Sequence, residues 1–313
     1  MVALTRPTSA SVIATPEDYA ECRRVMLAAS KNYSFASRFL PESVLPHVEA
    51  LYALMRVGDD RVDVSCEGFA SPLAAIDDWE STYWHAFRTG GSGNPVMRAY
   101  LDTALRCNIP SEVMAPYFRA MREDLTVTRF PTFADLLHYM EGSALTVGRA
   151  MTYILGVLPP HTTADTLPYA DSLSIAMQLS NFWRDIGQDF RINRVYLPGE
   201  DLARFGVSED DLGQGRITPQ FIALLEFEFD RTEKYYLHAR LGVHRLARGR
   251  LGVMTALEVY RSILGSIRRN NYDVFTRRAT TNRAQKLSLA LTAQWRLAAA
   301  RRNTGAYSAP SAT

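Results

Sequence analysis

Two pairs of aspartates in this sequence have a spacing that suits metal-assisted chemistry. Asp59 and Asp63 lie four residues apart in the stretch YALMRVGDDRVD. Asp185 and Asp189 repeat that spacing in NFWRDIGQDF. Residues four apart share one face of an α-helix and are separated by a rise of about 6 Å. Two buried carboxylates placed in this way repel each other and lose their hydration, unless a divalent cation lies between them.

The residues around these aspartates suit a bound diphosphate. Mg²⁺ prefers oxygen ligands and is usually held by one or two carboxylates together with substrate phosphates. Asn181 lies one turn before Asp185 and offers a further oxygen, while Arg56 and Arg184 can pair with phosphate. If the two helices face each other, they form an acidic site for a metal–diphosphate complex.

A single aspartate pair of this spacing is also common on the solvated face of a helix. Here both pairs have apolar flanks, such as Leu54 and Trp183, and these argue against simple solvation. Gly58 and Gly187 lie beside the acids, although a glycine costs about 1 kcal/mol in a helix interior. Close approach of a ligand and proximity to a helix end both explain such glycines.

Helical periodicity runs through nearly the whole chain, and no stretch shows the period-two alternation of a strand. Helices are predicted over 16–29, 45–64, 70–88, 96–107, 111–127, 132–157, 164–190, 218–241, 251–270 and 281–301. The breaks are short, as in TGGSGNP and LPPHTT, and none is long enough to be a linker between domains. We therefore predict an all-α, single-domain protein over 15–301, with disordered ends at 1–14 and 302–313.

The composition narrows the class of protein. With 313 residues and 47% hydrophobic residues, the chain can bury a large core, and its net charge of +2 gives no strong electrostatic case for binding nucleic acid. Its three cysteines form no paired motif, which indicates a reducing compartment. The apolar stretch 144–160 contains an arginine and is too short to span a bilayer. We expect a cytoplasmic protein that can contact a membrane peripherally.

From about residue 25 to residue 285, the chain resembles the squalene/phytoene synthase family, the head-to-head trans-isoprenyl diphosphate synthases. The most specific stretch is QLSNFWRDIGQDFRINRVYLP, which is similar to the second aspartate motif of the family; its matching residues are Gln178, Asn181, Arg184, Asp185, Asp189 and Tyr196. The first motif is matched by Tyr52, Arg56, Asp59 and Asp63.

Three further segments carry the resemblance. SKNYSFASRFLP is similar to the N-terminal segment, with Asn32 and Tyr33 in place of the usual Ser and Phe. YMEGSALTVG has Leu145 where many members have glycine, and YRSILGSIRRNNYDVFTRRA contains Tyr260 and Arg277. The whole pattern is most like that of bacterial phytoene synthases.

The resemblance implies an isoprenoid-synthase helical bundle around a central apolar cavity. It also implies a prenyltransferase that condenses two geranylgeranyl diphosphates, through a cyclopropyl diphosphate, to phytoene in carotenoid biosynthesis. The implied ligands of Mg²⁺, with Mn²⁺ as a second candidate, are Asp59, Asp63, Asn181, Asp185 and Asp189. The implied substrate-binding residues are Ser30, Lys31, Asn32, Tyr33, Tyr52, Arg56, Tyr139, Gln178, Asn181, Arg184, Tyr196, Tyr260 and Arg277. The implied catalytic residues are the four aspartates with Tyr52, Arg56 and Tyr260; Tyr33, Tyr52, Tyr139 and Tyr260 can stabilise an allylic cation.

Other interpretations stay open at this stage. The alternative substrate is farnesyl diphosphate, used by squalene or dehydrosqualene synthases, and squalene formation would require NADPH. DDRVD also fits the DDxxD motif of chain-elongating synthases and terpene cyclases, but those families lack the arrangement around Asp185. A non-catalytic relative would typically have lost aspartates. Tyr52 and Tyr139 could be core aromatics, and the sequence does not assign the oligomeric state.

Overall fold

The computed structural model describes residues 13–29, 39–63, 67–280 and 282–305, with side chains except for Asp63, Arg283 and residues 300–305. The predicted substrate-binding residues Ser30, Lys31, Asn32 and Tyr33 lie outside the described residues, as do the ends 1–12 and 306–313.

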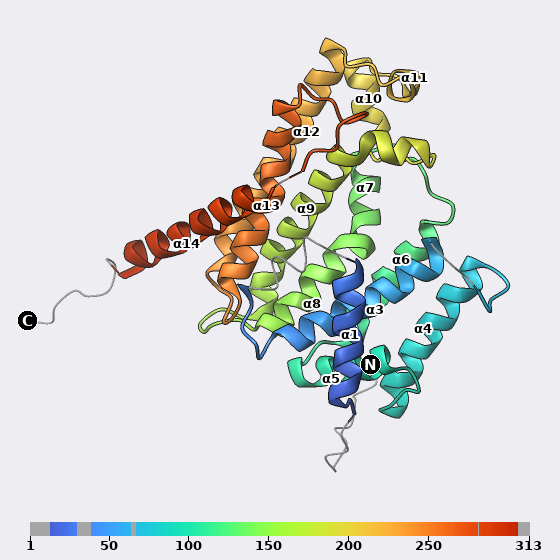
Figure 1. Ribbon diagram of the computed structural model, residues 1–313, viewed down its shortest axis with the longest axis vertical. Helices are drawn as coiled ribbons and strands as arrows, with labels where there is room; N and C mark the ends of the chain where they lie inside the picture. Colours follow the sequence, from blue (N-terminus) through green and yellow to red (C-terminus); the bar gives the residue numbers. More distant parts are fainter. Residues whose placement is uncertain (1–12, 30–38, 64–66, 281, 306–313) are drawn as a thin grey trace, which may run out of the picture.

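The described chain is all-α, as predicted (Figure 1). Its elements are α1 (Pro16–Ala29), α3 (Leu45–Asp63), α4 (Pro72–Thr89), α5 (Pro95–Cys107), the 3₁₀ turn η2 (Ser111–Met114), α6 (Ala115–Glu123), α7 (Phe133–Met140), the π turn η3 (Glu141–Leu145), α8 (Thr146–Leu155), α9 (Thr163–Arg191), α10 (Gly199–Phe205), α11 (Glu209–Gly213), α12 (Pro219–Val243), α13 (Arg250–Arg269) and α14 (Arg283–Gly305). Within the described residues, two isolated β-bridges join loops: one pairs Arg129 with Val195, and the other pairs Val157 with Leu246.

Local sequence signals account for the ends of these helices. α9 starts with a capping box in which Thr162 and Asp165 satisfy each other's backbone N–H groups. α4 and α12 each begin with a side-chain cap followed by proline, and α4 ends at Gly90, whose φ of 77° suits glycine. α14 continues to Gly305, which lies within the tail expected from residue 302.

Two apolar clusters form the core. One joins α9, α12 and α13 and includes Trp183, Phe229 and Leu264. The other joins α1, α3, α4 and α5 and includes Trp79. Val253 of α13 packs against both clusters, so the aspartate-bearing helices α3 and α9 belong to two halves that meet. None of the helices in the described ranges combines the length and apolar character needed to cross a bilayer.

Candidate active site between the two aspartate helices

The first aspartate motif lies on the C-terminal half of α3. Tyr117 of α6 donates from its hydroxyl to the carbonyl oxygen of Met55 at 2.7 Å and to Asp59 Oδ1 at 3.2 Å. A Cβ atom at Gly58 would lie 2.1 Å from the Tyr117 hydroxyl. The absence of a side chain at Gly58 therefore makes room for Tyr117. This is a third reason for a glycine here, besides the approach of a ligand and the proximity of a helix end. Arg56, predicted to pair with phosphate, forms an ion pair with Asp60.

The second motif lies near the C-terminal end of α9 and is largely buried. The Asp185 side chain is 13% exposed and accepts hydrogen bonds from Arg184 at 2.8 Å and from Arg278 at 2.8 and 2.9 Å. Burial acts to raise the pKa of Asp185, but the two guanidinium groups outweigh burial and hold the pKa below its ordinary value. At Asp189, burial and then the charge of Asp185 raise the pKa to about 7.

Gly187 explains how Arg278 reaches this motif. A Cβ atom at Gly187 would lie 2.7 Å from Phe275 Cα and 2.9 Å from the Val274 carbonyl oxygen. The segment after α13 therefore crosses directly over α9 at this glycine and places Arg278 against Asp185. The neighbouring Arg277, predicted to bind substrate, is exposed and acts electrostatically on Asp273.

A polar cluster around Asp124 joins the two motifs. Tyr139 donates from its hydroxyl to Asp124 Oδ1 at 2.7 Å, and Arg194 donates to the Asp124 carbonyl oxygen at 2.9 Å and to the Tyr196 hydroxyl at 3.2 Å. On one side, the charge of Asp124 adds to burial in raising the pKa of Tyr117, which contacts Asp59. On the other side, Arg194 acts electrostatically on Asp189.

The predicted Tyr139 and Tyr196 therefore belong to one cluster, whose other members the sequence did not single out. Tyr196 also stacks on Phe182, with ring centroids 3.8 Å apart, and both line a small hollow together with Asp189. Four residues are added to the candidate site: Tyr117, Asp124, Arg194 and Arg278. Arg194 and Arg278 lie within quoted motif segments, whereas Tyr117 and Asp124 lie outside every quoted motif.

Tyr260 of α13 lies between the two motif helices. It is partly buried against the α9, α12 and α13 cluster. Burial raises the pKa of its hydroxyl, and both Arg184 of α9 and Tyr52 of α3 act on it electrostatically. Tyr260, Gln178 and Asn181 line a cavity of about 250 Å³ whose other walls are mainly apolar. Three predicted substrate-binding residues thus meet at one cavity.

The cavity follows one face of α9. Its lining residues on that helix are Thr166, Tyr169, Ala170, Leu173, Ser174, Met177, Gln178 and Asn181, which have the spacing of a single helical stripe. Small residues of α8, α12 and α13 form much of the facing wall, among them Gly148, Ala239, Gly242 and Ala256.

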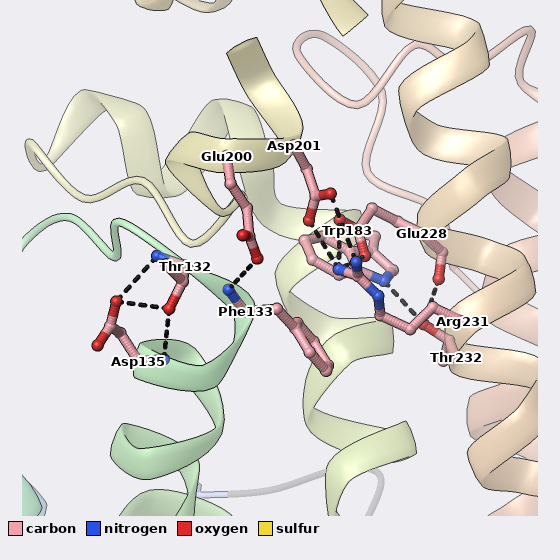
Figure 2. Close-up of polar contacts among 9 residues, drawn as sticks. All are labelled: Thr132, Phe133, Asp135, Trp183, Glu200, Asp201, Glu228, Arg231 and Thr232. Carbon is pink, nitrogen blue, oxygen red and sulfur yellow. Dashed lines mark hydrogen bonds and ion pairs between the residues drawn. The ribbon is translucent and has the colours of Figure 1, made fainter. Parts of the chain in front are cut away.

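The back of α9 is held by buried polar contacts (Figure 2). Trp183 donates from its indole N–H to Thr232 Oγ1 at 2.9 Å. One turn earlier on α12, Glu228 and Asp201 of α10 both accept from Arg231, whose guanidinium lies 4.0 Å from the centre of the Phe133 ring. Similarly, Trp79 donates to the Leu54 carbonyl oxygen behind the first motif. Each aspartate helix is therefore backed by an anchored tryptophan.

The donor set fits a hard divalent cation. Carboxylate and amide oxygens are the ligands that Mg²⁺ takes, and the raised pKa of Asp189 reports a buried negative charge that a cation would compensate. Among the side chains described, no three acidic, histidine or cysteine groups converge closely enough to hold a metal by themselves. Diphosphate oxygens and water usually complete magnesium coordination.

Comparisons with known proteins agree with this architecture. The family described as squalene/phytoene synthase matches residues 26–285. The chain is 33% identical to a 15-cis-phytoene synthase of Synechococcus elongatus, covering 90% of this chain and 94% of that protein, and 32% identical to a phytoene synthase of Arthrospira platensis, covering 89% and 93%. Among solved structures, a dehydrosqualene synthase superimposes with a TM-score of 0.83 at 26% identity, covering 90% of this chain and 97% of that one. A squalene synthase from Alicyclobacillus acidocaldarius gives 0.75 at 29% identity, covering 84% and 99%.

Proposed function

Because the chain belongs to the squalene/phytoene synthase family, we propose that it is a phytoene synthase, a prenyltransferase that joins two geranylgeranyl diphosphates head to head. The observation that carries this proposal is the apolar cavity that begins at Gln178 and Asn181 and continues along α9. Relatives 30–33% identical over most of the chain have the same activity in their names.

The length of the cavity favours a C20 substrate. Asn181 and Thr166 are 15 residues apart (181 − 166) and both line it, so it follows α9 for about 22 Å at 1.5 Å per residue. An extended carbon chain advances about 1.27 Å per bond, a third of the 3.8 Å that three backbone bonds span. The sixteen-carbon main chain of a geranylgeranyl group then spans about 19 Å, and the twelve-carbon main chain of a farnesyl group about 14 Å.

The first step of the reaction breaks the bond between C1 and the diphosphate oxygen of one substrate. Asp59, Asp63, Asn181, Asp185 and Asp189 would hold Mg²⁺, which when bound neutralises charge on the leaving diphosphate. Arg184 and Arg278 lie at Asp185 and can add positive charge there. The apolar walls would keep water from the allylic cation, and Tyr260, which lines the same cavity, would stabilise that cation with its ring.

Carbon–carbon bond formation follows in the same cavity. The C2–C3 double bond of the second substrate attacks the cation, and loss of one proton closes a cyclopropane. The second diphosphate then leaves, and rearrangement with loss of another proton gives the linear C40 triene. These steps require a space that excludes water next to the proposed diphosphate site, and the mainly apolar cavity that Tyr260, Gln178 and Asn181 line supports this requirement.

Product identification tests the proposal. Purified protein is incubated with geranylgeranyl diphosphate or farnesyl diphosphate, with Mg²⁺ and with or without NADPH, and the hydrocarbons are identified by mass spectrometry. We expect phytoene from the C20 substrate without NADPH. A C30 product from the C15 substrate, with no C40 product, would contradict the proposal.

The C15 reaction is the second candidate because a dehydrosqualene synthase and a squalene synthase are among the similar solved structures. A requirement for NADPH would identify squalene formation, whereas a C30 product without NADPH would identify dehydrosqualene formation.

A further inference from the structure

The C-terminal helix α14 has two apolar faces, of which one is packed. Ala293 and Leu297 pack against the cluster built on α9, α12 and α13, and Ala290 is buried as well. Another stripe is exposed and consists of Leu287, Leu291 and Trp295, whose side chains are 57%, 67% and 70% exposed. The spacing of four residues places these three on one face of the helix. This set is called the α14 stripe below.

The exposure of Trp295 is unusual within this protein. Trp79 and Trp183 are fully buried, and Trp84 is partly buried. A row of large, exposed apolar side chains along one face of a helix indicates a surface that binds a partner. The exposure of the three side chains makes the stripe accessible to a large partner. Figure 1 shows that the C-terminal part of α14 extends beyond the neighbouring helices.

The charge of α14 identifies the kind of partner. Its sequence contains five basic residues, Arg283, Lys286, Arg296, Arg301 and Arg302, and no Asp or Glu. Arg296 pairs with Glu258 of α13 at 3.3 Å, which ties the helix to the body. Basic helices with leucine and tryptophan on an apolar face bind in the interface of anionic bilayers, where tryptophan is favoured.

We propose that α14 docks the protein on an anionic lipid bilayer, with the α14 stripe inserted among the headgroups. A second copy of the chain fits this helix less well, because a two-fold contact would bring the basic residues of one α14 toward those of the other with no acidic residue on either helix. The docking proposal rests on the proposed function in one respect only. A C40 hydrocarbon product is insoluble in water and would have to pass into a bilayer.

Vesicle binding of the full chain tests this proposal. The protein is sedimented with phosphatidylcholine vesicles, with or without phosphatidylglycerol, at low and high salt. We expect binding that requires the anionic lipid, weakens with salt and shifts the tryptophan emission to shorter wavelength. The variant Leu291→Ser/Trp295→Ser should weaken binding about tenfold or more. The matched control is Leu237→Ser/Leu241→Ser, which alters two leucines on α12 that are 53% and 64% exposed.

Three measurements separate the outcomes. Circular dichroism checks that each variant folds, and all four altered side chains are exposed enough for folding to be retained. Sedimentation velocity measures the oligomeric state: a wild-type dimer that Leu291→Ser/Trp295→Ser converts to a monomer, without vesicle binding, would overturn the proposal. Equal vesicle binding by both double variants would also overturn it. Synthase activity in detergent should be unchanged in the α14 variant, so failure of the docking proposal and failure of the synthase proposal are distinguishable.

Discussion

At the scale of single residues, the candidate site pairs an ionised acid with a neighbour that resists ionisation. Two guanidinium groups contact Asp185, whereas Asp189 is buried beside that negative charge. The pKa of about 7 places the ionisation of Asp189 near neutral pH, and a bound cation would favour its charged form. The four aspartates remain predicted metal ligands, and their replacement tests that role directly.

The first prediction concerns Asp185. Replacement by asparagine keeps the shape but removes the charge, so we expect Asp185→Asn to lower kcat by at least about a hundredfold, as loss of a group that stabilises leaving-group charge does. The control is Asp210→Asn on α11, whose side chain is 71% exposed. Initial rates with geranylgeranyl diphosphate and Mg²⁺ measure the effect. Similar rates for both variants would remove Asp185 from the reaction.

The second prediction distinguishes two adjacent arginines. Arg278 contacts Asp185, so Arg278→Ala should raise the pKa of that carboxyl and lower kcat/KM about tenfold or more. Arg277→Ala should change kcat/KM far less, because Arg277 acts on Asp273 and not on Asp185. A larger loss for Arg277→Ala would instead support the substrate-binding role implied by the family resemblance. Arg278→Lys should recover only part of the activity, because lysine cannot donate in the same bidentate way.

At the scale of the elements, the glycines beside the aspartates decide which segments can approach the two helices. Gly58 admits the Tyr117 hydroxyl, and Gly187 admits the backbone at 274–275. In both cases the close approach brings a polar side chain to an aspartate. The sequence alone does not predict these two contacts, because Tyr117 and Asp59, and likewise Arg278 and Asp185, are more than 50 residues apart along the chain.

The third prediction follows from Gly187. A methyl group there would overlap the Phe275 backbone, which cannot turn away as a long side chain can. We expect Gly187→Ala to destabilise the protein by about 1–3 kcal/mol, the usual cost of overpacking, and to lower activity by moving Arg278. Urea unfolding measures the first effect. Gly91→Ala is the control, since nothing lies within 4 Å of the added atom and its φ is not left-handed; equal stabilities would contradict the prediction.

The fourth prediction concerns the stripe of α9 that lines the cavity. Ala170 lies 11 residues from Asn181 (181 − 170), which is about 16 Å along the helix and beyond the reach of an extended farnesyl chain. Ala170→Phe should therefore exclude the C20 substrate while leaving room for C15. We expect the ratio of C30 to C40 product to rise at least about tenfold. Ala164→Phe, at an exposed position of the same helix, should leave the ratio unchanged.

The sequence predicted long helices well and isolated contacts poorly. Both ends of α3 and of α9 lie within one residue of the predicted ends, because the apolar spacing of these helices extends over many turns. α10 and α11 were missed, since helices of seven and five residues show too few turns for a period to appear. The role of Tyr117 and Asp124 depends on folding that brings distant segments together, and neither lies in a recognisable motif.

At the scale of the whole molecule, stability and the site share one buried cluster. Arg231 joins α12 to α10 through Asp201 and to its own helix through Glu228, while Phe133 of α7 covers the guanidinium (Figure 2). Glu228 is fully buried, and burial raises the pKa of its carboxyl to about 8. The negative charge of Asp201, which shares the Arg231 guanidinium, adds to this shift. Trp183, next to Arg184, packs behind the second motif through Thr232, which bonds to the Glu228 carbonyl oxygen.

The fifth prediction is a pH dependence of folding that arises at Glu228. The folded pKa of about 8 lies above the ordinary value of 4.5, so the folded state keeps a proton that the unfolded state has released. This contribution to stability is complete below pH 4.5 and is lost as the pH rises to about 8. Glu228→Gln cannot titrate and still offers an oxygen to Arg231, so its unfolding free energy should fall less steeply between pH 5 and pH 8, measured by urea unfolding at each pH.

The matched variant is Glu226→Gln, two residues earlier on the same helix, where the shift of the carboxyl pKa has the opposite sign. Hydrogen bonds from Arg268 hold the pKa of Glu226 below its ordinary value, so its contribution is present above pH 4.5 and is lost as the pH falls through the folded pKa. Glu226→Gln should therefore lose stability at pH 8 relative to the wild-type protein, whereas Glu228→Gln should not. If both variants keep the wild-type dependence of unfolding free energy on pH, the proton that the folded state retains does not lie on Glu228. The contacts behind Trp183 would then hold α9 independently of pH.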